Sequence, residues 1–248
     1  MKQTMKNLIL INGAMVCALA IQGGKPYAQE ASPPADQTQV TAVDILLEPD
    51  ATMIQHAEAA NARLLKVFPK GFSLDSTHHP HITMVQRFVR TADLDRVYAA
   101  AEKVFANSKL TDLKLKAFKY YYIPDKSLGV SGIVVEPTPE LIKLEQKLVD
   151  AVAPFTVKTG TSAAFVTTPE DPVIDPLLIE YVSVFVPKYS GEHYMPHVTT
   201  GLAPREYLDK MLAEPFESFT FSPVGVSVYH LGQYGTAAKK LKALGLKP

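Results

Sequence analysis

The sequence predicts an α+β fold. Short strand patterns and amphipathic helix patterns alternate irregularly along the chain, which favours α+β over a regular parallel βαβ array. The sequence contains neither a Gly-rich phosphate loop nor a G-x-S-x-G nucleophile elbow, the usual marks of parallel-sheet enzymes. Its 248 residues are enough for one large domain or for two small lobes around a shared core.

The first ordered elements are expected from residue 40 onward. Residues 41–47 are β-branched and apolar, which predicts a strand. Residues 51–67 place apolar side chains at helical spacing and predict a helix. A second strand is expected at 81–89. A second helix is expected at 92–105, with Thr91 as its N-cap.

The middle of the chain predicts a hairpin followed by a helix. Residues 113–123 and 129–135 have strand character, and residues 125–127 form a turn between them. Thr138 and Pro139 open the next helix, with proline at its first position. The apolar stripe of this helix consists of Leu141, Leu144, Leu148 and Val152.

The last part of the chain predicts further strands and helices. A loop rich in Pro, Asp and Thr covers residues 167–176. The apolar run at 177–186 predicts a strong strand, and residues 197–202 predict another. Beyond them we expect a helix at 204–212, one or two strands at 219–231 and a final helix at 237–244.

The N-terminal segment has the pattern of a secretory signal peptide. Lys2 and Lys6 precede a mostly apolar run at 8–20, which ends in the small-x-small pattern of a cleavage site at Ala20. Ala28 is a later candidate site. A membrane anchor and a frayed helix are the alternatives, but the run is short for a membrane span of roughly 20 residues.

This pattern divides the chain into three parts. We expect a signal peptide at 1–20, a flexible leader at 21–39 rich in Gly, Pro, Ala, Gln and Ser, and one bilobal domain at 40–248. The expected location is periplasmic or secreted, without stable membrane insertion after cleavage.

Charge and cysteine content exclude several classes of function. The formal net charge is zero, so the protein lacks the global basic field that holds a long nucleic acid, although a small anionic ligand needs only local donors. The only cysteine, Cys17, lies in the expected signal peptide. The mature domain would therefore contain no disulfide, thiol nucleophile or zinc–thiolate site.

The most informative feature is a duplicated motif. Pro80-His81-Ile82-Thr83-Met84 matches Pro196-His197-Val198-Thr199-Thr200, and both copies fall in expected strands. Because alternate side chains of a strand point to the same face, each histidine projects beside its own threonine. The residue between them, Ile82 or Val198, then points into a core.

This set of groups suits a phosphodiester. One imidazole can deprotonate an attacking hydroxyl or water while the other protonates the leaving oxygen, and each transfer contributes about 10²–10⁴-fold. Threonine hydroxyls can donate to the non-bridging oxygens. No metal or cofactor is needed. A single His-x-Thr is more often structural, but the proline-led duplication favours catalysis.

At these residues the sequence resembles the 2H phosphoesterase superfamily, which includes bacterial RNA 2′,5′-ligase-like proteins and 2′,3′-cyclic nucleotide phosphodiesterases. The resemblance covers residues 41–244 and includes the first strand (42–47), both motifs and the 116-residue separation of the two histidines. It implies a two-lobed fold with pseudo-twofold symmetry. Each lobe would be an antiparallel sheet backed by helices, with a cleft between the lobes.

The resemblance also assigns roles by position. His81 and His197 would be the acid–base pair, and Thr83 and Thr199 would hold the phosphate. The sequence leaves open which histidine is the acid. Thr200 departs from the pattern, because many members have a hydrophobic residue there.

Other residues near the motifs have two interpretations each. His78, His79 and His193 could suggest a metal site, but their spacings do not match and no carboxylate lies at a ligand-like offset, which favours a polar rim. Arg87 shares the strand face of His81 by period two and is either a phosphate ligand or a solvated surface charge.

Several tyrosines are candidates for stacking a nucleobase. These are Tyr120, Tyr121, Tyr122, Tyr194 and Tyr229. Strand alternation sends Tyr120 and Tyr122 to one face and Tyr121 to the other, so at least one belongs to the core. Tyr122 is the candidate chosen for substrate binding.

The sequence therefore predicts a metal-independent phosphodiesterase, a monomer acting on 2′,5′-linked or 2′,3′-cyclic nucleotides or short RNA ends, with no long nucleic acid as partner. Two alternatives stay open: a non-catalytic module that binds phosphorylated ligands, and phosphodiester transfer in the direction of RNA 2′,5′-ligation.

Overall fold

The computed structural model describes residues 39–245, apart from 107 and 109. The expected signal peptide and almost all of the expected leader lie outside the described residues. Every described residue belongs to one compact unit. Within this described part, none of the helices combines the length and apolar character that a membrane crossing requires.

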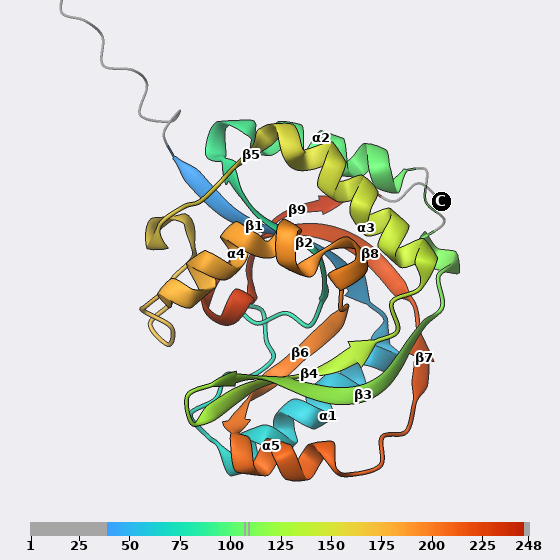
Figure 1. Cartoon of the computed structure of the whole chain (residues 1–248), viewed down its shortest axis with the longest axis vertical. Coiled ribbons are helices and arrows are strands. Elements are labelled where there is room, and N and C mark those ends of the chain that lie inside the picture. The colour runs from blue at the N-terminus through green and yellow to red at the C-terminus, as the bar shows by residue number, and fades with distance from the viewer. Residues whose placement is uncertain (1–38, 107, 109, 246–248) are drawn as a thin grey trace, which may run out of the picture. The chain divides into compact units, whose positions relative to one another are not determined.

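Two antiparallel sheets form the framework (Figure 1). The strands of the first are β1 (Val40–Pro49), β2 (Ile82–Arg90), β5 (Thr156–Val157), β8 (Pro223–Leu231) and β9 (Ala237–Leu244). Their order in the sheet is β5-β2-β1-β8-β9. The strands of the second are β3 (Leu115–Asp125), β4 (Leu128–Val135), β6 (His197–Pro204) and β7 (Phe219–Phe221). Their order is β6-β4-β3-β7, and the predicted α+β class is confirmed.

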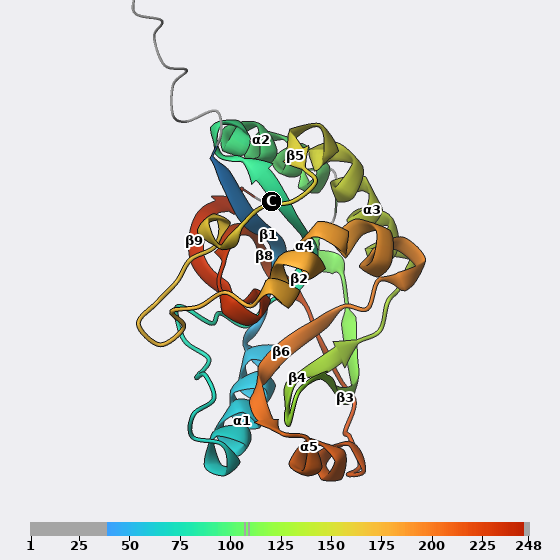
Figure 2. The ribbon, with the colours of Figure 1, turned by 60° about the vertical axis from the view of Figure 1, so that its left-hand side comes forward.

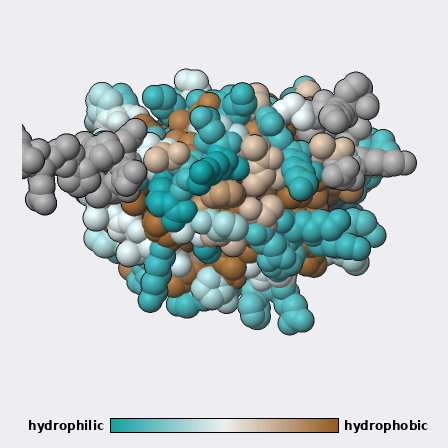
Figure 3. Space-filling model, turned by 90° about the horizontal axis from the view of Figure 1, so that it is seen from above, coloured by the Kyte–Doolittle hydropathy of each residue, from teal (hydrophilic) through white to brown (hydrophobic). Residues whose placement is uncertain are grey.

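Five α-helices flank these sheets in the described residues. They are α1 (Ala51–Val67), α2 (Leu94–Phe105), α3 (Pro139–Val152), α4 (Pro176–Tyr189) and α5 (Arg205–Leu212). The helices α2 and α3 share one buried core with the five-stranded sheet, whereas α1 and α5 cover the four-stranded sheet (Figures 1 and 2). Hydrophilic side chains spread over much of the outer face seen from above, with hydrophobic residues between them (Figure 3).

Neither sheet is built from one continuous stretch of chain. The hairpin β3–β4 follows β2 in sequence but lies in the other sheet, and β6 and β7 lie there too before the chain returns to β8. The helix α1 lies between β1 and β2 in sequence, yet it packs against β6 of the opposite sheet. The two halves are therefore interleaved.

Local signals explain most of the elements. Asp50 accepts hydrogen bonds from the backbone N–H groups of Thr52 and Met53 and caps α1, which begins and ends where the apolar spacing predicts. Thr138 caps α3 in the same way, with Pro139 at its first position. The predicted hairpin between β3 and β4 is confirmed, and Lys126 takes a positive φ of 53° in its turn.

The prediction of a strand at 177–186 was wrong, because this segment belongs to α4. The run is apolar and rich in β-branched residues, so its period does not separate a strand from a buried helix. The deciding signal is at its start, where the Asp175 carboxylate accepts from the N–H of Leu177 and proline occupies the first turn. Leu178, Val182 and Phe185 form its buried face.

The prediction of a final helix at 237–244 was also wrong, because these residues form β9. Alanine, lysine and leucine favour helices intrinsically, but pairing with β8 from Val226↔Leu244 to Leu231↔Ala237 overrides this weak preference. The lysines suit an edge strand, since they discourage further pairing. Thr91 does not cap α2 either. It lies in a 3₁₀ turn, and its hydroxyl pairs with that of Thr41 at 2.8 Å.

Candidate active site

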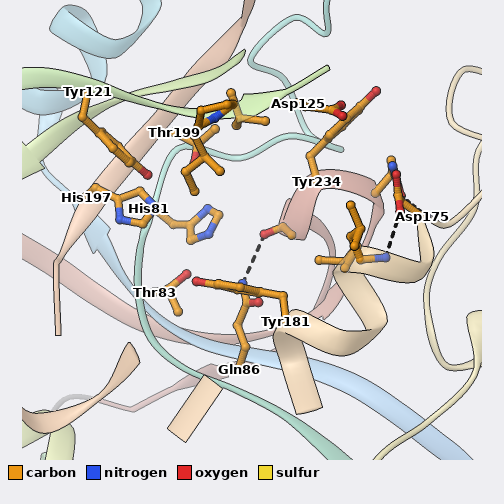
Figure 4. A pocket seen from close by; sticks show the side chains of 17 residues that line it. His81, Thr83, Gln86, Tyr121, Asp125, Asp175, Tyr181, His197, Thr199 and Tyr234 are labelled. Atoms are coloured by element: carbon orange, nitrogen blue, oxygen red, sulfur yellow. Dashed lines mark hydrogen bonds between the residues drawn. The ribbon is translucent and has the colours of Figure 1, made fainter. Parts of the chain in front are cut away.

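Both His-x-Thr motifs lie where the two sheets face each other. His81 directly precedes β2 and His197 opens β6. Ile82 and Val198 are fully buried in the main core, whereas all four motif side chains line one cavity (Figure 4). The alternation predicted for these residues is therefore confirmed.

The cavity has a volume of about 230 Å³, somewhat below the range of roughly 300–1,000 Å³ that is usual for ligand sites. Its walls come from both sheets, from the start of α4 and from the 3₁₀ turn Gln233–Gly235. Beside the motif residues it is lined by Gln86, Tyr121, Ile123, Pro124, Asp125, Val130, Asp175, Leu177, Leu178, Tyr181, Gln233, Tyr234 and Gly235. None of these described lining residues is Lys or Arg.

The backbone fixes the same tautomer in both histidines. Nδ1 of His81 lies 2.6 Å from the carbonyl oxygen of His79, and Nδ1 of His197 lies 2.8 Å from that of Met195. A carbonyl oxygen can only accept, so Nδ1–H donates in each case. In both copies the carbonyl belongs to the residue two positions earlier. Each Nε2 is thereby left without a backbone partner.

A buried carboxylate distinguishes the first motif. Asp44 of β1 is 0% exposed, and its Oδ2 accepts from Thr83 Oγ1 at 2.6 Å and from Gln86 Nε2 at 2.9 Å. The same oxygen lies 3.4 Å from Nε2 of His81. Burial alone lowers the pKa of His81, but the hydrogen bond and charge of Asp44 outweigh it, so the pKa of His81 is raised above its usual value.

The second motif has an aromatic neighbour instead. The ring of Tyr121 packs edge-on against His197, with the ring centroids 4.9 Å apart. Burial lowers the pKa of His197, and the nearby His81 lowers it further. The Met195 carbonyl and the more distant Asp44 only partly offset these effects. The two imidazoles are therefore driven toward opposite protonation states.

Each motif strand contains a β-bulge directly after the motif threonine. Opposite β1, Leu46↔Thr83 is followed by Ile45↔Val85, so Met84 is an extra residue. Opposite β4, Gly132↔Thr199 is followed by Ser131↔Gly201, so Thr200 is extra. Bulges beside active sites re-aim side chains. The matching position of the two bulges makes the halves of the site structurally equivalent.

A side chain from elsewhere satisfies a backbone carbonyl at each bulge. The hydroxyl of Tyr194 donates to the carbonyl of Thr83 at 2.7 Å. The amide of Asn61 donates to the carbonyl of Thr200 at 2.9 Å. Both carbonyls are thus satisfied despite the interrupted ladders.

Comparison with solved structures identifies the fold. The crystal structure of TT0787 from Thermus thermophilus aligns with 84% of this chain and 100% of its own, with a TM-score of 0.50 and 13% sequence identity. The chain has the 2H phosphoesterase fold. The 2H architecture explains why two equivalent motif strands face each other.

Two further solved structures align with lower scores. Escherichia coli LigT complexed with 3′-AMP covers 85% of this chain and 100% of LigT, at 12% identity and a TM-score of 0.42. Usb1 from Kluyveromyces marxianus covers 86% of this chain and 100% of its own, at 9% identity and a TM-score of 0.42. No protein-family model and no curated protein matches the sequence.

The bulge in this 2H fold corrects the expectation for Arg87. Period two holds from His81 to Thr83, but the extra residue Met84 shifts the alternation. Gln86 therefore points into the cavity. Arg87 lies on the other face, where its guanidinium donates to Thr156 Oγ1 at 2.7 Å.

The expected alternation of Tyr120, Tyr121 and Tyr122 is confirmed, but the tyrosine chosen for substrate binding is on the wrong face. Tyr122 does not line the cavity. It packs beside α1 and α5, and its hydroxyl donates to Asp209 at 2.6 Å. Tyr121, on the opposite strand face, lines the cavity instead. Tyr194 is buried and bonded to the β2 bulge, and Tyr229 stacks with His79.

The three remaining histidines near the motifs are not equivalent. His78 is buried, stacks on Phe72 and bonds to Asp171 at 3.0 Å, which joins two loops. His193 is exposed beside His197, so it fits the expected rim. Within the described residues, no group of three or more His, Cys, Asp or Glu side chains is arranged to hold a metal ion.

Sequence reasoning missed three residues of the site: Asp44, which bonds to the first motif, and Gln86 and Tyr181, which line the cavity. Asp44 is the only charged residue in the apolar segment 41–47, and a buried charge of this kind requires partners. That was the available signal. Gln86 was hidden by the bulge, and Tyr181 by the mistaken strand at α4.

Proposed function

We propose that this protein is a metal-independent phosphodiesterase that acts on a small nucleotide diester, 2′,5′-linked, 2′,3′-cyclic or at a short RNA end. One observation carries the proposal. Two imidazoles with the same fixed tautomer line one cavity, and their surroundings push their pKa values in opposite directions. Such a pair is suited to serve as acid and base.

From the opposed environments we infer the roles. His197 is the base: its Nε2 takes a proton from water while the water oxygen bonds to phosphorus. The bond from phosphorus to the leaving oxygen breaks, and His81 gives that oxygen a proton. The cycle leaves His197 charged and His81 neutral, and exchange of protons with solvent restores the starting states.

The two threonines have different partners, and so we assign them different tasks. Within the described residues the Thr199 hydroxyl makes no hydrogen bond, which leaves it able to donate to a non-bridging phosphate oxygen. The single hydroxyl proton of Thr83 is already donated to Asp44. We therefore propose that Thr83 positions Asp44 against His81 rather than holding the phosphate.

The composition of the cavity wall narrows the substrate. Two carboxylates, Asp125 and Asp175, line the cavity together with the glutamines, whereas no Lys or Arg does so among the described residues. Additional phosphate groups would be repelled there. A diester with a single negative charge and hydroxyl-rich arms fits better than a polyphosphate or a long nucleic acid.

The direct test is removal of each imidazole. His81→Ala and His197→Ala should each lower kcat/KM by about 10²-fold or more, while circular dichroism stays unchanged. The control His56→Ala changes an exposed histidine that stacks on Phe219 outside the cavity, and it should retain activity. EDTA should not inhibit. Full activity in either active-site variant contradicts the proposal.

The substrates for this test are a panel of 2′,5′-linked dinucleotides and 2′,3′-cyclic nucleotides. Thermal stabilisation by one of them without turnover would instead favour the binding module. Joining of a cyclic phosphate to a 5′-hydroxyl would favour ligation.

Export and a monomeric state are also part of the proposal. The N-terminal charge and apolar pattern supports export. Mass spectrometry of the protein recovered outside the cytoplasm should show cleavage after Ala20 or Ala28, and light scattering measures the oligomeric state.

A further inference from the structure

A second cavity adjoins the catalytic histidines. Its volume is about 240 Å³. The helix α4 contributes Tyr181, Phe185 and Tyr189, and the segment before β6 contributes Tyr194 and Met195. The remaining described lining residues are Thr83, Ile123, His193 and His197, so no Asp, Glu, Lys or Arg is among them. The cavity is therefore aromatic and uncharged apart from histidine.

The two cavities meet at the reacting groups. Four residues line both of them: Thr83, Ile123, Tyr181 and His197. His81 lines only the first cavity. Figure 4 shows His81 between His197 and the part of the first cavity around Tyr234. A ligand phosphate between the histidines would thus have space on both sides.

Exposed apolar side chains gather around the second cavity. Tyr189, Met195 and Ile123 are 40%, 44% and 46% exposed. They are three of the eight large hydrophobic residues that are exposed in the described part of the chain. Exposed apolar side chains are thus concentrated at this cavity. Apolar patches of this kind mark binding grooves. Flat aromatic walls favour a flat aromatic occupant.

We propose that the second cavity binds a planar aromatic group, such as a nucleobase, on the ester arm that stays attached to phosphorus. The preferred substrate is then a linear diester with two organic arms rather than a cyclic diester. This inference rests on the proposed function, in which His81 is the acid.

The assignment of the arms follows from the geometry of displacement. The leaving oxygen takes its proton from His81, and so the leaving arm lies in the first cavity. Water attacks from the side of His197, forming the new phosphorus–oxygen bond as the old one breaks. The retained arm is the remaining organic group, and the aromatic cavity beside His197 can receive it. A cyclic diester has only one organic arm and leaves one cavity empty.

The test compares two substrates with the same leaving group. Bis(p-nitrophenyl) phosphate and methyl p-nitrophenyl phosphate both release p-nitrophenolate, but they retain an aryl and a methyl arm respectively. Tyr189→Ala should lower the ratio of their kcat/KM values about tenfold, since stacking contributes on this scale. Tyr189→Phe keeps the ring and should keep the ratio.

A matched control separates this effect from general loss of exposed apolar surface. Leu212→Ala changes a residue that is 44% exposed at the end of α5 and lines neither cavity, so the ratio should not change. If circular dichroism shows that Tyr189→Ala is unfolded, Met195→Ala tests the same ratio from the opposite wall.

The outcomes distinguish this inference from the proposed function. An unchanged ratio in a folded Tyr189→Ala overturns the inference alone. So does a kcat/KM for 2′,3′-cyclic nucleotides that equals or exceeds that for 2′,5′-linked dinucleotides. Absence of turnover with every diester overturns the proposed function, and the inference falls with it.

Discussion

The two halves of the active site share a backbone design and differ in the neighbours of the imidazole. In each half a proline precedes the histidine, a carbonyl two residues earlier binds Nδ1, and a bulge follows the threonine. The first half adds the buried carboxylate of Asp44, whereas the second adds the ring of Tyr121.

This difference shows how one duplicated motif can supply both an acid and a base. The shared backbone presents two equivalent Nε2 atoms to the cavity. The neighbours then favour the charged form at His81 and the neutral form at His197. Specialisation therefore depends on residues outside the motif.

The largest contrast is expected between the two threonines. Thr199→Val removes a free donor and should lower kcat about 10²–10³-fold, the usual cost of losing one transition-state donor. Thr83→Val removes a hydroxyl whose proton is already donated to Asp44, and it should lower kcat by less than about tenfold at the optimal pH. Steady-state kinetics of both variants decide this, and equal losses would mean that the threonines act alike.

The pH profile tests the source of the asymmetry. Activity requires neutral His197, so it falls as pH drops through the lowered pKa of that group. It also requires charged His81, so it falls as pH rises through the raised pKa of His81. The wild-type plot of kcat/KM against pH should be bell-shaped, with one limb below and one above about pH 6.5. The two apparent pKa values then belong to the coupled pair of histidines.

Asp44→Asn should move the alkaline limb to lower pH, because the hydrogen bond and charge that mainly offset the effect of burial on the pKa of His81 are lost, and only the His79 carbonyl still raises it. Each pH unit by which this limb moves should lower the activity about tenfold at pH values above the limb. The acid limb should move less, since Asp44 has the smallest influence on the pKa of His197. If the alkaline limb does not move, Asp44 does not raise the pKa of the acid, His81.

The two bulges should affect stability, and they should have the smallest direct effect on the chemistry. Met84 is fully buried, and Met84→Ala should cost about 2–5 kcal/mol of unfolding free energy through the cavity it leaves. The Thr200 hydroxyl is buried without a hydrogen-bond partner, so Thr200→Val should be neutral or stabilise by about 1 kcal/mol. Denaturant unfolding measures both, and a marked loss in Thr200→Val would show that this hydroxyl is needed.

The parts of the site that could be predicted were local in sequence. The motif pairs followed from strand alternation, and α1, α3 and the β3–β4 hairpin followed from caps, turns and periodicity. Arg87 was misplaced because a bulge is a property of two paired strands, which one strand's pattern does not reveal. The partners of Asp44 come from β2, so its role can be recognised only once the pairing register of β1 and β2 is known.

The two misassigned segments have a related cause. In α4, short-range propensity was ambiguous, and the capping signal at Asp175 was the better guide. In β9, propensity pointed to a helix, but the open edge of β8 offered backbone partners that the segment alone does not show. Tertiary pairing decided both the sheet order and the identity of the edge strand.

The interleaving of the two sheets has a consequence for biosynthesis. During translation β1 and β2 emerge early, but β8, the other neighbour of β1, is synthesised only after β6 and β7 of the second sheet. A chain that ends before β8 therefore lacks the complete five-stranded sheet that holds Asp44 and His81 in place. Contacts this distant in sequence also slow folding. Proton transfer would thus begin only after β8 has been synthesised, and neither half could work as an isolated fragment.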